Sequence, residues 1–176
     1  MSQPTYRQPF QHAWRVADIE AAAERFSATL GIGPFFVAEY RGKVFEEVLH
    51  FGQSTELHLK TAIAYSGDTQ VELVEPQGSA PSIYTLTNDL PAGRYHHTCY
   101  WSDDIDADID HYAANGCAAV DVGKMRGGPR FAYLDARETL GSVIELLEFD
   151  EGIATLFDSW KRKNQAWDGE TPFIRL

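Results

Sequence analysis

Two glutamates occupy the same place in two similar strings, VELVEP at residues 71–76 and IELLEF at residues 144–149. Glu72 and Glu145 each follow one apolar residue and precede two more, a short apolar run that is consistent with a strand inside a sheet. An ionised carboxylate buried in such a strand is costly unless it has a partner. Both glutamates are therefore expected either to face solvent or to bind a cation.

A glutamine and a histidine open a second pair of similar strings, QHAWRVAD and HTCYWSDD. Gln11 lies seven residues before Asp18, and His97 lies seven residues before Asp104. Each string is a short apolar–polar run that ends in an acidic residue. We expect the two strings to form equivalent strands, with Gln11 and His97 at matching positions.

A helical pattern follows each of these acidic residues. After Asp18, apolar or small residues recur at helical spacing up to Gly31, a residue suited to the left-handed conformation that ends many helices. After Asp104, a similar pattern runs to Asn115 and Gly116. Both aspartates are expected to be N-caps, because their carboxylates can accept hydrogen bonds from the free N–H groups of the first helical turn.

Each half then continues through strand-like segments. The expected strands are 35–40, 44–51, 57–65 and 71–75 in the first half, and 118–125, 130–135 and 142–149 in the second. We divide the chain into an N-terminal arm (1–9), a first module (10–80), a linker (81–93), a second module (94–150) and a C-terminal extension (151–176).

The C-terminal extension has its own amphipathic pattern. Ile153, Leu156, Phe157 and Trp160 have helical spacing and share one apolar face. Such a face must be covered by the chain's own sheet or by a second copy of the chain. A lid over a pocket and a homodimer interface are both open, and we expect a homodimer.

The order strand–helix–strands, present twice with a glutamate in each last strand, resembles the vicinal oxygen chelate superfamily. This superfamily includes glyoxalase I, methylmalonyl-CoA epimerase, extradiol dioxygenases and bleomycin-resistance proteins. The string FSATLGIGPFF at 26–36 is similar to the passage from helix to strand in the glyoxalase-like branch, the branch of methylmalonyl-CoA epimerase. The resemblance implies an α+β fold in which two βαβββ modules form a curved mixed sheet, or open barrel, with a helical C-terminal extension.

The resemblance also implies a metal site with up to four ligands from the first and last strands of each half. The matching residues are Gln11, Glu72, His97 and Glu145, and Gln11 departs from the family pattern, which has histidine there. Alternate residues of a strand face opposite sides, so an inward Gln11 turns His12 outward. A slip of one residue in the register would reverse this arrangement and make His12 the ligand.

This set of an amide oxygen, two carboxylates and one imidazole suits divalent Mg, Mn, Co, Ni, Fe or Zn. The resemblance implies an isomerase, epimerase or lyase that acts on a small oxygenated metabolite and stabilises an enolate through the metal. Glu145 or Glu72 is the implied catalytic group that moves the proton. Strand parity further predicts that Arg15 and Trp101 line the pocket, and that His96, next to His97, faces the opposite side.

Two other functions are open at this stage. One is a metal-free binding protein of the bleomycin-resistance type, because glutamine in place of histidine weakens the metal site. The other is an Fe(II)-dependent dioxygenase with two histidines and one carboxylate. The dioxygenase requires His12 to face inward together with His97 and Glu145.

Composition narrows the class of partner. The 176 residues include 26 Asp and Glu but only 15 Lys and Arg, a net charge of −11, which argues against nucleic acid as a partner. Without an apolar run of about 18 residues we expect no membrane span, and the first ten residues do not resemble a signal peptide. Two cysteines are too few for a disulfide framework and fit a reducing compartment. We expect a cytoplasmic protein that binds a small-molecule substrate and a second copy of itself.

Overall fold

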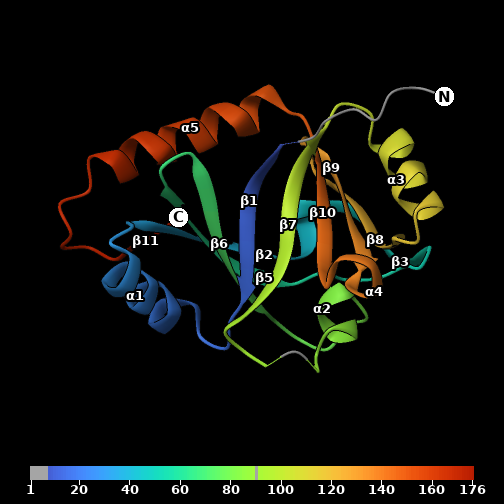
Figure 1. Ribbon diagram of the computed structural model, residues 1–176, viewed down its shortest axis with the longest axis horizontal. Helices are drawn as coiled ribbons and strands as arrows, with labels where there is room; N and C mark the ends of the chain where they lie inside the picture. The colour runs from blue at the N-terminus through green and yellow to red at the C-terminus, as the bar shows by residue number, and fades with distance from the viewer. Residues whose placement is uncertain (1–7, 90) are drawn as a thin grey trace.

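The computed structural model describes residues 8–89 and 91–176, and within them the strands join into one curved, unclosed mixed sheet (Figure 1). The strands are β1 (Pro9–Arg15), β2 (Phe35–Tyr40), β3 (Phe45–His50), β4 (Gln53–Ser54), β5 (Leu59–Ser66), β6 (Thr69–Pro76), β7 (Arg94–Ser102), β8 (Ala118–Met125), β9 (Arg130–Ala136), β10 (Ser142–Glu148) and β11 (Phe173–Arg175). The helices are α1 (Ile19–Leu30), α2 (Ile83–Leu86), α3 (Ile105–Ala114), α4 (Arg137–Leu140) and α5 (Glu151–Gln165), with a 3₁₀ turn at Gly42–Val44. The expected α+β fold is confirmed.

The sheet is built from two similar halves that meet at β1 and β7. The strand order is β11-β2-β5-β6-β1-β7-β10-β9-β8-β3-β4, with β1 antiparallel to β7, and with β6 and β10 parallel to β1 and β7 respectively. Gln11 pairs with Cys99, and Ala13 pairs with His97. This reciprocal pairing places Gln11 and His97 at equivalent positions on either side of the seam.

One strand of the first half belongs to the sheet of the second half. The strand expected at 44–51 forms as β3, but it pairs with β8 rather than with a strand of the first half. Val48 of β3 is buried there in a cluster with Val120 and Phe131. The first βαβββ unit is therefore β1-α1-β2-β5-β6, and β3 with β4 extends the far edge of the second.

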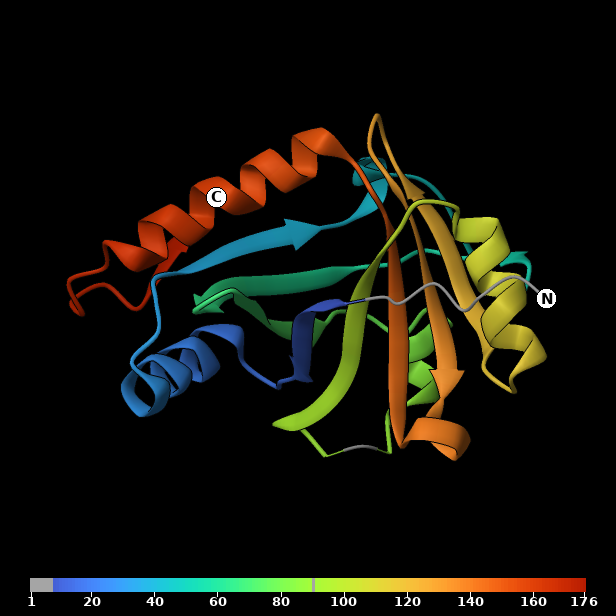
Figure 2. The same ribbon diagram turned by 45° about the horizontal axis from the view of Figure 1, so that its top comes forward.

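The predicted helix caps are confirmed at the starts of α1 and α3. The Asp18 carboxylate accepts hydrogen bonds from the N–H groups of Glu20 and Ala21, and Asp104 accepts one from Ala107. Gly31 closes α1 with a φ of 68°, in the left-handed region. The helices α1 and α3 lie against the outside of their own halves (Figures 1 and 2).

Two further helices lie at opposite ends of the sheet (Figure 1). At one end, α2 buries Ile83 and Tyr84 among residues of both halves, and the Ile83 N–H donates to the buried Asp121 carboxylate. At the other end, α5 crosses the sheet and packs Trp160 against Phe36 of β2. The interior between these two helices contains the site described below. In the described part of the chain, no helix is both long and apolar enough to span a bilayer.

Candidate functional site

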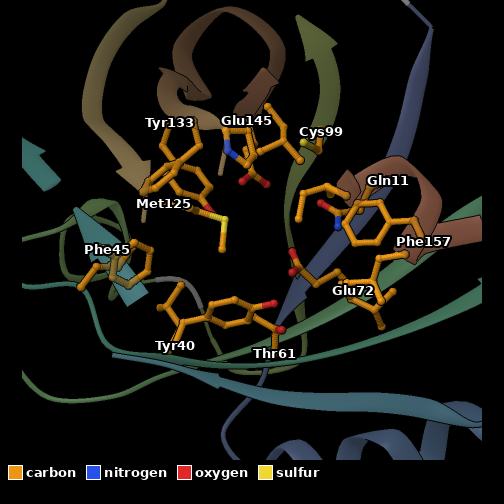
Figure 3. A pocket seen from close by; sticks show the side chains of 18 of the residues that line it. Gln11, Tyr40, Phe45, Thr61, Glu72, Cys99, Met125, Tyr133, Glu145 and Phe157 are labelled. Atoms are coloured by element: carbon orange, nitrogen blue, oxygen red, sulfur yellow. The ribbon is translucent and has the colours of Figure 1, made fainter. Parts of the chain in front are cut away.

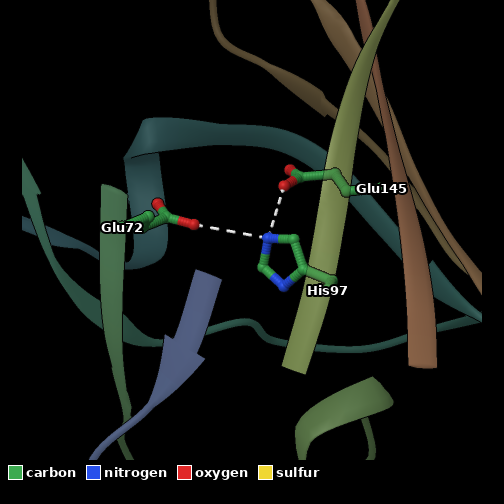
Figure 4. A group of neighbouring side chains, drawn as sticks. All are labelled: Glu72, His97 and Glu145. Atoms are coloured by element: carbon green, nitrogen blue, oxygen red, sulfur yellow. Dashed lines mark ion pairs between the residues drawn. The ribbon is translucent and has the colours of Figure 1, made fainter. Parts of the chain in front are cut away.

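Three side chains from both halves converge on one point inside the curved sheet. Glu72 comes from β6, His97 from β7 and Glu145 from β10, and their ligand atoms lie within 4.8 Å of one another (Figure 4). The Nε2 atom of His97 is 2.9 Å from Oε2 of Glu145 and 3.4 Å from Oε2 of Glu72. The side chains are almost enclosed, with exposed fractions of 0% for His97, 10% for Glu72 and 12% for Glu145.

Two polar atoms in this region are buried without a hydrogen bond of acceptable geometry. Nε2 of His97 makes no hydrogen bond of acceptable geometry, although both carboxylates are near it. Oε1 of Gln11 is likewise unpartnered, because the Gln11 amide uses its Nε2 to donate to Gln70. Buried polar atoms are rarely left unsatisfied, so each points to a missing partner. Imidazole, carboxylate and amide donors together fit a divalent cation.

The electrostatics of the three residues follow from their burial and mutual contact. Burial on its own lowers the pKa of His97, but the carboxylates of Glu145 and Glu72 beside its Nε2 outweigh burial and raise the pKa to about 9. Burial raises the pKa of Glu72, and the nearby Glu145 charge adds to that effect. Burial also raises the pKa of the Cys99 thiol well above its usual value. Without a cation the site holds a protonated imidazole between two carboxyl groups, and Cys99 is an inert thiol.

His96 lies beside His97 rather than on the opposite side, so the expectation for this residue was wrong. Its Nδ1 is 2.9 Å from Nδ1 of His97, and its Nε2 is 3.0 Å from the Thr87 hydroxyl. The cause is an irregularity in the register of β1 and β7 between Ala13 and Trp14, which leaves His96 without a regular pair. Strand alternation fails at this position, and both histidines are buried.

The hydrogen bonds around His96 determine which nitrogen of His97 faces the site. The Thr87 hydroxyl donates to the carbonyl of Ile83, so it accepts from Nε2–H of His96. Burial lowers the pKa of His96 well below its usual value, so His96 is neutral and its Nδ1 is an acceptor. Nδ1–H of His97 therefore donates to His96, and Nε2 of His97 points toward the two carboxylates. This is the outer contact that orients metal-binding histidines in proteins.

A cavity of about 750 Å³, counting its open mouth, extends from these residues (Figure 3). Gln11, Glu72, Cys99 and Glu145 form its polar end. The other lining residues are Tyr40, Phe45, Leu57, Leu59, Thr61, Ile63, Met125, Pro129, Phe131, Tyr133, Leu147, Ile153, Leu156, Phe157 and Trp160.

Two residues predicted to line the pocket lie outside it. Arg15 donates to the side chain of Asn88 at 2.6 Å, and Trp101 stacks on Phe10 with ring centroids 4.4 Å apart. Strand parity predicts the face of a residue but not its depth. Arg15 is four residues beyond Gln11, about 13 Å along the strand, and is past the floor of the cavity. Trp101 is separated from the cavity by Phe157, which lines it.

His12 also lies outside the cavity. Its Nδ1 is 3.0 Å from the hydroxyl of Tyr95, and its ring contacts that tyrosine. Gln11, in contrast, is buried and lines the cavity. The described structure therefore does not assemble the pair of histidines that an Fe(II) dioxygenase site requires here.

Several residues that line the cavity were not predicted from the sequence. Tyr133 pairs with Glu145 across β9 and β10, and its ring lies edge-on to His97. Its pKa is raised well above the usual value, first by burial and then by the Glu145 charge. Alternation along β9 places Phe131 on the same face and could have identified both residues. Tyr40 and Thr61 face the site from β2 and β5, and only the three-dimensional pairing of these strands shows it.

Comparisons with known proteins agree with this geometry. Residues 10–133 match the model of the Glyoxalase/Bleomycin resistance protein/Dioxygenase superfamily. An ethylmalonyl-CoA/methylmalonyl-CoA epimerase of Cereibacter sphaeroides is 29% identical over 135 residues, which are 74% of this chain and 90% of that protein. The structure of methylmalonyl-CoA epimerase from Mycobacterium tuberculosis has a TM-score of 0.59 at 17% identity, covering 88% of this chain and 97% of that one. A hypothetical protein of Bacillus halodurans also gives 0.59 at 17% identity, covering 84% of this chain and 97% of its own. The resemblance inferred from the repeat is confirmed: the chain belongs to the Glyoxalase/Bleomycin resistance protein/Dioxygenase superfamily.

Proposed function

We propose that this protein is a metal-dependent isomerase or epimerase that moves a proton on a carbon next to a carbonyl group of a small molecule. The observation that carries the proposal is the convergence of Glu72, His97 and Glu145 at the polar end of a cavity, with Nε2 of His97 buried between the two carboxylates. The similarity to an epimerase at 29% identity supports the same reaction class.

Gln11, Glu72, His97 and Glu145 are the residues that would hold a divalent ion. The two carboxylates balance its charge, and the contact with His96 presents Nε2 of His97 to it. A bound divalent cation would supply the positive charge that polarises a carbonyl and makes the neighbouring carbon acidic. The donor set does not distinguish among Mg, Mn, Co, Ni, Fe and Zn. The test therefore compares the protein loaded with different metal ions.

Glu145 and Glu72 are the proposed groups that take up and return the proton. Among the described residues that line the cavity, they are the only carboxylates, and they come from opposite halves of the sheet. A base in a buried site works best when its pKa lies near the working pH, and burial shifts the pKa of Glu72 in that direction. The surrounding aromatic wall limits the access of water, which would compete for the proton.

The test is deuterium incorporation from D₂O into the carbon next to a carbonyl. The protein is freed of metal, reloaded separately with Zn²⁺, Co²⁺ or Mn²⁺, and incubated with methylmalonyl-CoA or with methyl mandelate, a neutral hydroxy ester. Mass spectrometry then measures the exchange. We expect exchange with at least one loaded form and one probe, and a large loss of exchange after Glu145→Gln or Glu72→Gln, whichever removes the base. Binding of the probes without exchange under any loading would support a metal-free binding protein instead.

We also propose that the protein works as a homodimer. The large side chains of Phe51 and Phe149 are each more than half exposed, and a second copy of the chain would cover apolar side chains of this kind. Light scattering coupled to size-exclusion chromatography tests this point. A mass of one chain, 19.7 kDa, at all concentrations would contradict it.

A further inference from the structure

We infer that the substrate is an uncharged molecule with a small oxygenated head and an apolar body, and that helix α5 selects this body. The inference rests on the proposed function for the place of the head, at Glu72 and Glu145. It concerns the rest of the cavity, which the proposed reaction leaves undefined.

The charge of the cavity wall excludes anionic groups from the body of the substrate. Among the described lining residues there is no lysine or arginine, and Glu72 and Glu145 are the acidic ones. The two basic residues on either side of Met125 have other partners: Lys124 pairs with Glu46 at 3.3 Å, and Arg126 donates to the backbone carbonyls of Lys43 and Phe45. A carboxylate or phosphate in the cavity would lose its water without gaining a cationic partner, apart from an ion at the head.

The wall facing the two glutamates is apolar and aromatic. Phe45, Met125 and Phe131 contribute to it. Phe45 and Met125 lie on the side away from Gln11 (Figure 3). The ring of Phe131 lies over Gly123, with its nearest atom 2.3 Å from the position that a Cβ would take there. The ring can therefore lie close to the strand instead of projecting into the cavity. This arrangement leaves space for an apolar body.

Helix α5 closes the remaining side with four apolar residues on one face: Ile153, Leu156, Phe157 and Trp160. This helix follows residue 133, the last residue of the family match. The wall that it forms is thus an addition to the part of the chain matched by the family model. A mostly apolar and aromatic lining with a few polar groups at one end is typical of small-molecule sites.

The helix is held in place by contacts along its length and beyond its end. Trp160 stacks on Phe36 with ring centroids 5.1 Å apart, and Asn164 accepts from the N–H of Tyr65 while donating to the carbonyl of Pro34. After the helix, Trp167 packs on Gly33, and β11 adds to the edge of β2. These contacts make α5 a fixed wall with a defined shape, which is what selection of a substrate body requires.

Binding of two matched probes tests the inference. Methyl mandelate and mandelate share a phenyl body and adjacent oxygens, but the ester is neutral and mandelate is an anion. Dissociation constants are measured by equilibrium dialysis with the metal-free protein and with the Zn²⁺-loaded protein. We expect the metal-free protein to bind the ester at least 10-fold more tightly than mandelate, and the Zn²⁺-loaded protein to show a smaller preference, because the mandelate carboxylate can bind the ion at the head. The metal-free arm separates this inference from the proposed function, because it is independent of metal binding and of turnover.

Variants that add a positive charge test whether the cavity wall causes the preference for the ester over mandelate. Met125→Lys and Leu156→Lys place a cation at the cavity wall and are expected to reduce the preference for the ester at least five-fold. Leu140→Lys adds the same charge at an exposed site outside the cavity and is expected to leave it unchanged. Leu156 is 42% exposed and tolerates lysine if Met125→Lys does not fold. Equal or tighter binding of mandelate by the unmodified metal-free protein, no saturable binding of the ester, or an equal effect of Leu140→Lys would overturn the inference.

Discussion

The two halves of the sheet present equivalent side chains of different chemistry to the same point. Gln11 and Glu72 come from the first half, and His97 and Glu145 from the second. The carboxylates match, whereas an amide stands opposite an imidazole. Each of the two unlike groups is also held by an outer partner: Gln11 donates to Gln70, which donates to Tyr65, and His97 donates to His96. The comparison shows that the duplicated backbone sets where the side chains point, while the residue type sets what each can bind.

The largest loss of activity is expected from changes to Glu72 and Glu145, the residues at which the two halves match. Glu145→Gln and Glu72→Gln keep the shape of each side chain but remove its charge and its ability to take a proton. We expect deuterium exchange into a substrate to fall by about 10²–10⁴-fold for the residue that acts as the base. The exposed Glu46, changed to glutamine in the same way, is the control. Full activity in both site variants would show that neither carboxylate moves the proton.

The second prediction concerns the support of His97. His96→Gln removes the ring that accepts from Nδ1–H of His97, and we expect a 10–100-fold loss of metal affinity, the range typical of outer partners of metal ligands. His97→Ala, which removes a proposed ligand, is expected to cost more. Calorimetric titration with Zn²⁺ measures both, with His111→Ala on the surface of α3 as the control. An unchanged affinity in His96→Gln would mean that the contact between the histidines is structural only.

The third prediction uses the difference between the halves directly. Gln11→His makes the two halves alike and is expected to raise zinc affinity by about 10-fold or more, because imidazole is a stronger zinc ligand than an amide. Gln11→Ala should weaken binding by a similar factor. His12→Ala is the matched control, since His12 contacts Tyr95 outside the cavity. A loss of binding in His12→Ala without any loss in Gln11→Ala would assign the ligand to His12 instead.

The smallest expected effect is the release of a proton from His97 when a metal ion binds. The pKa of His97 is raised to about 9 without a metal, so the imidazole is charged at pH 7 and must lose its proton to bind an ion. We expect roughly one proton to be released per ion at pH 7, and none above the raised pKa. Affinity should therefore increase as the pH rises from 7 toward 9. Calorimetry in buffers of different ionisation enthalpy counts the protons, and the absence of release at pH 7 would contradict a charged His97.

Much of the fold was predictable because it is repeated in local patterns. The capping aspartates Asp18 and Asp104, the glycine that ends α1 and the two glutamate-bearing strands follow from spacing and hydrogen-bonding chemistry alone. The pairing of β3 with β8 of the second half was not predictable. It depends on the packing of Val48 with residues of that half, which local patterns do not show.

Strand alternation predicted which side chains face the candidate site. It did not predict how far along the strands the cavity extends or which other elements line it. Alternation places Gln11 inward and His12 outward, but it fails for His96, where the strand register is irregular. The same alternation does not show that Arg15 and Trp101 lie beyond the ends of the cavity. The contribution of α5 was left open because an amphipathic helix shows an apolar face without indicating what covers it.

The position of a bound ion tests the central claim most directly. Crystals of the Co²⁺-loaded protein, measured on both sides of the cobalt absorption edge, give an anomalous difference map that locates the metal independently of the protein model. We predict one peak, within bonding distance of Glu72, His97 and Glu145, with Gln11 as the fourth protein ligand. A peak at His12, or full occupancy elsewhere with none between these residues, would contradict the claim that the two halves of the sheet hold one ion between them.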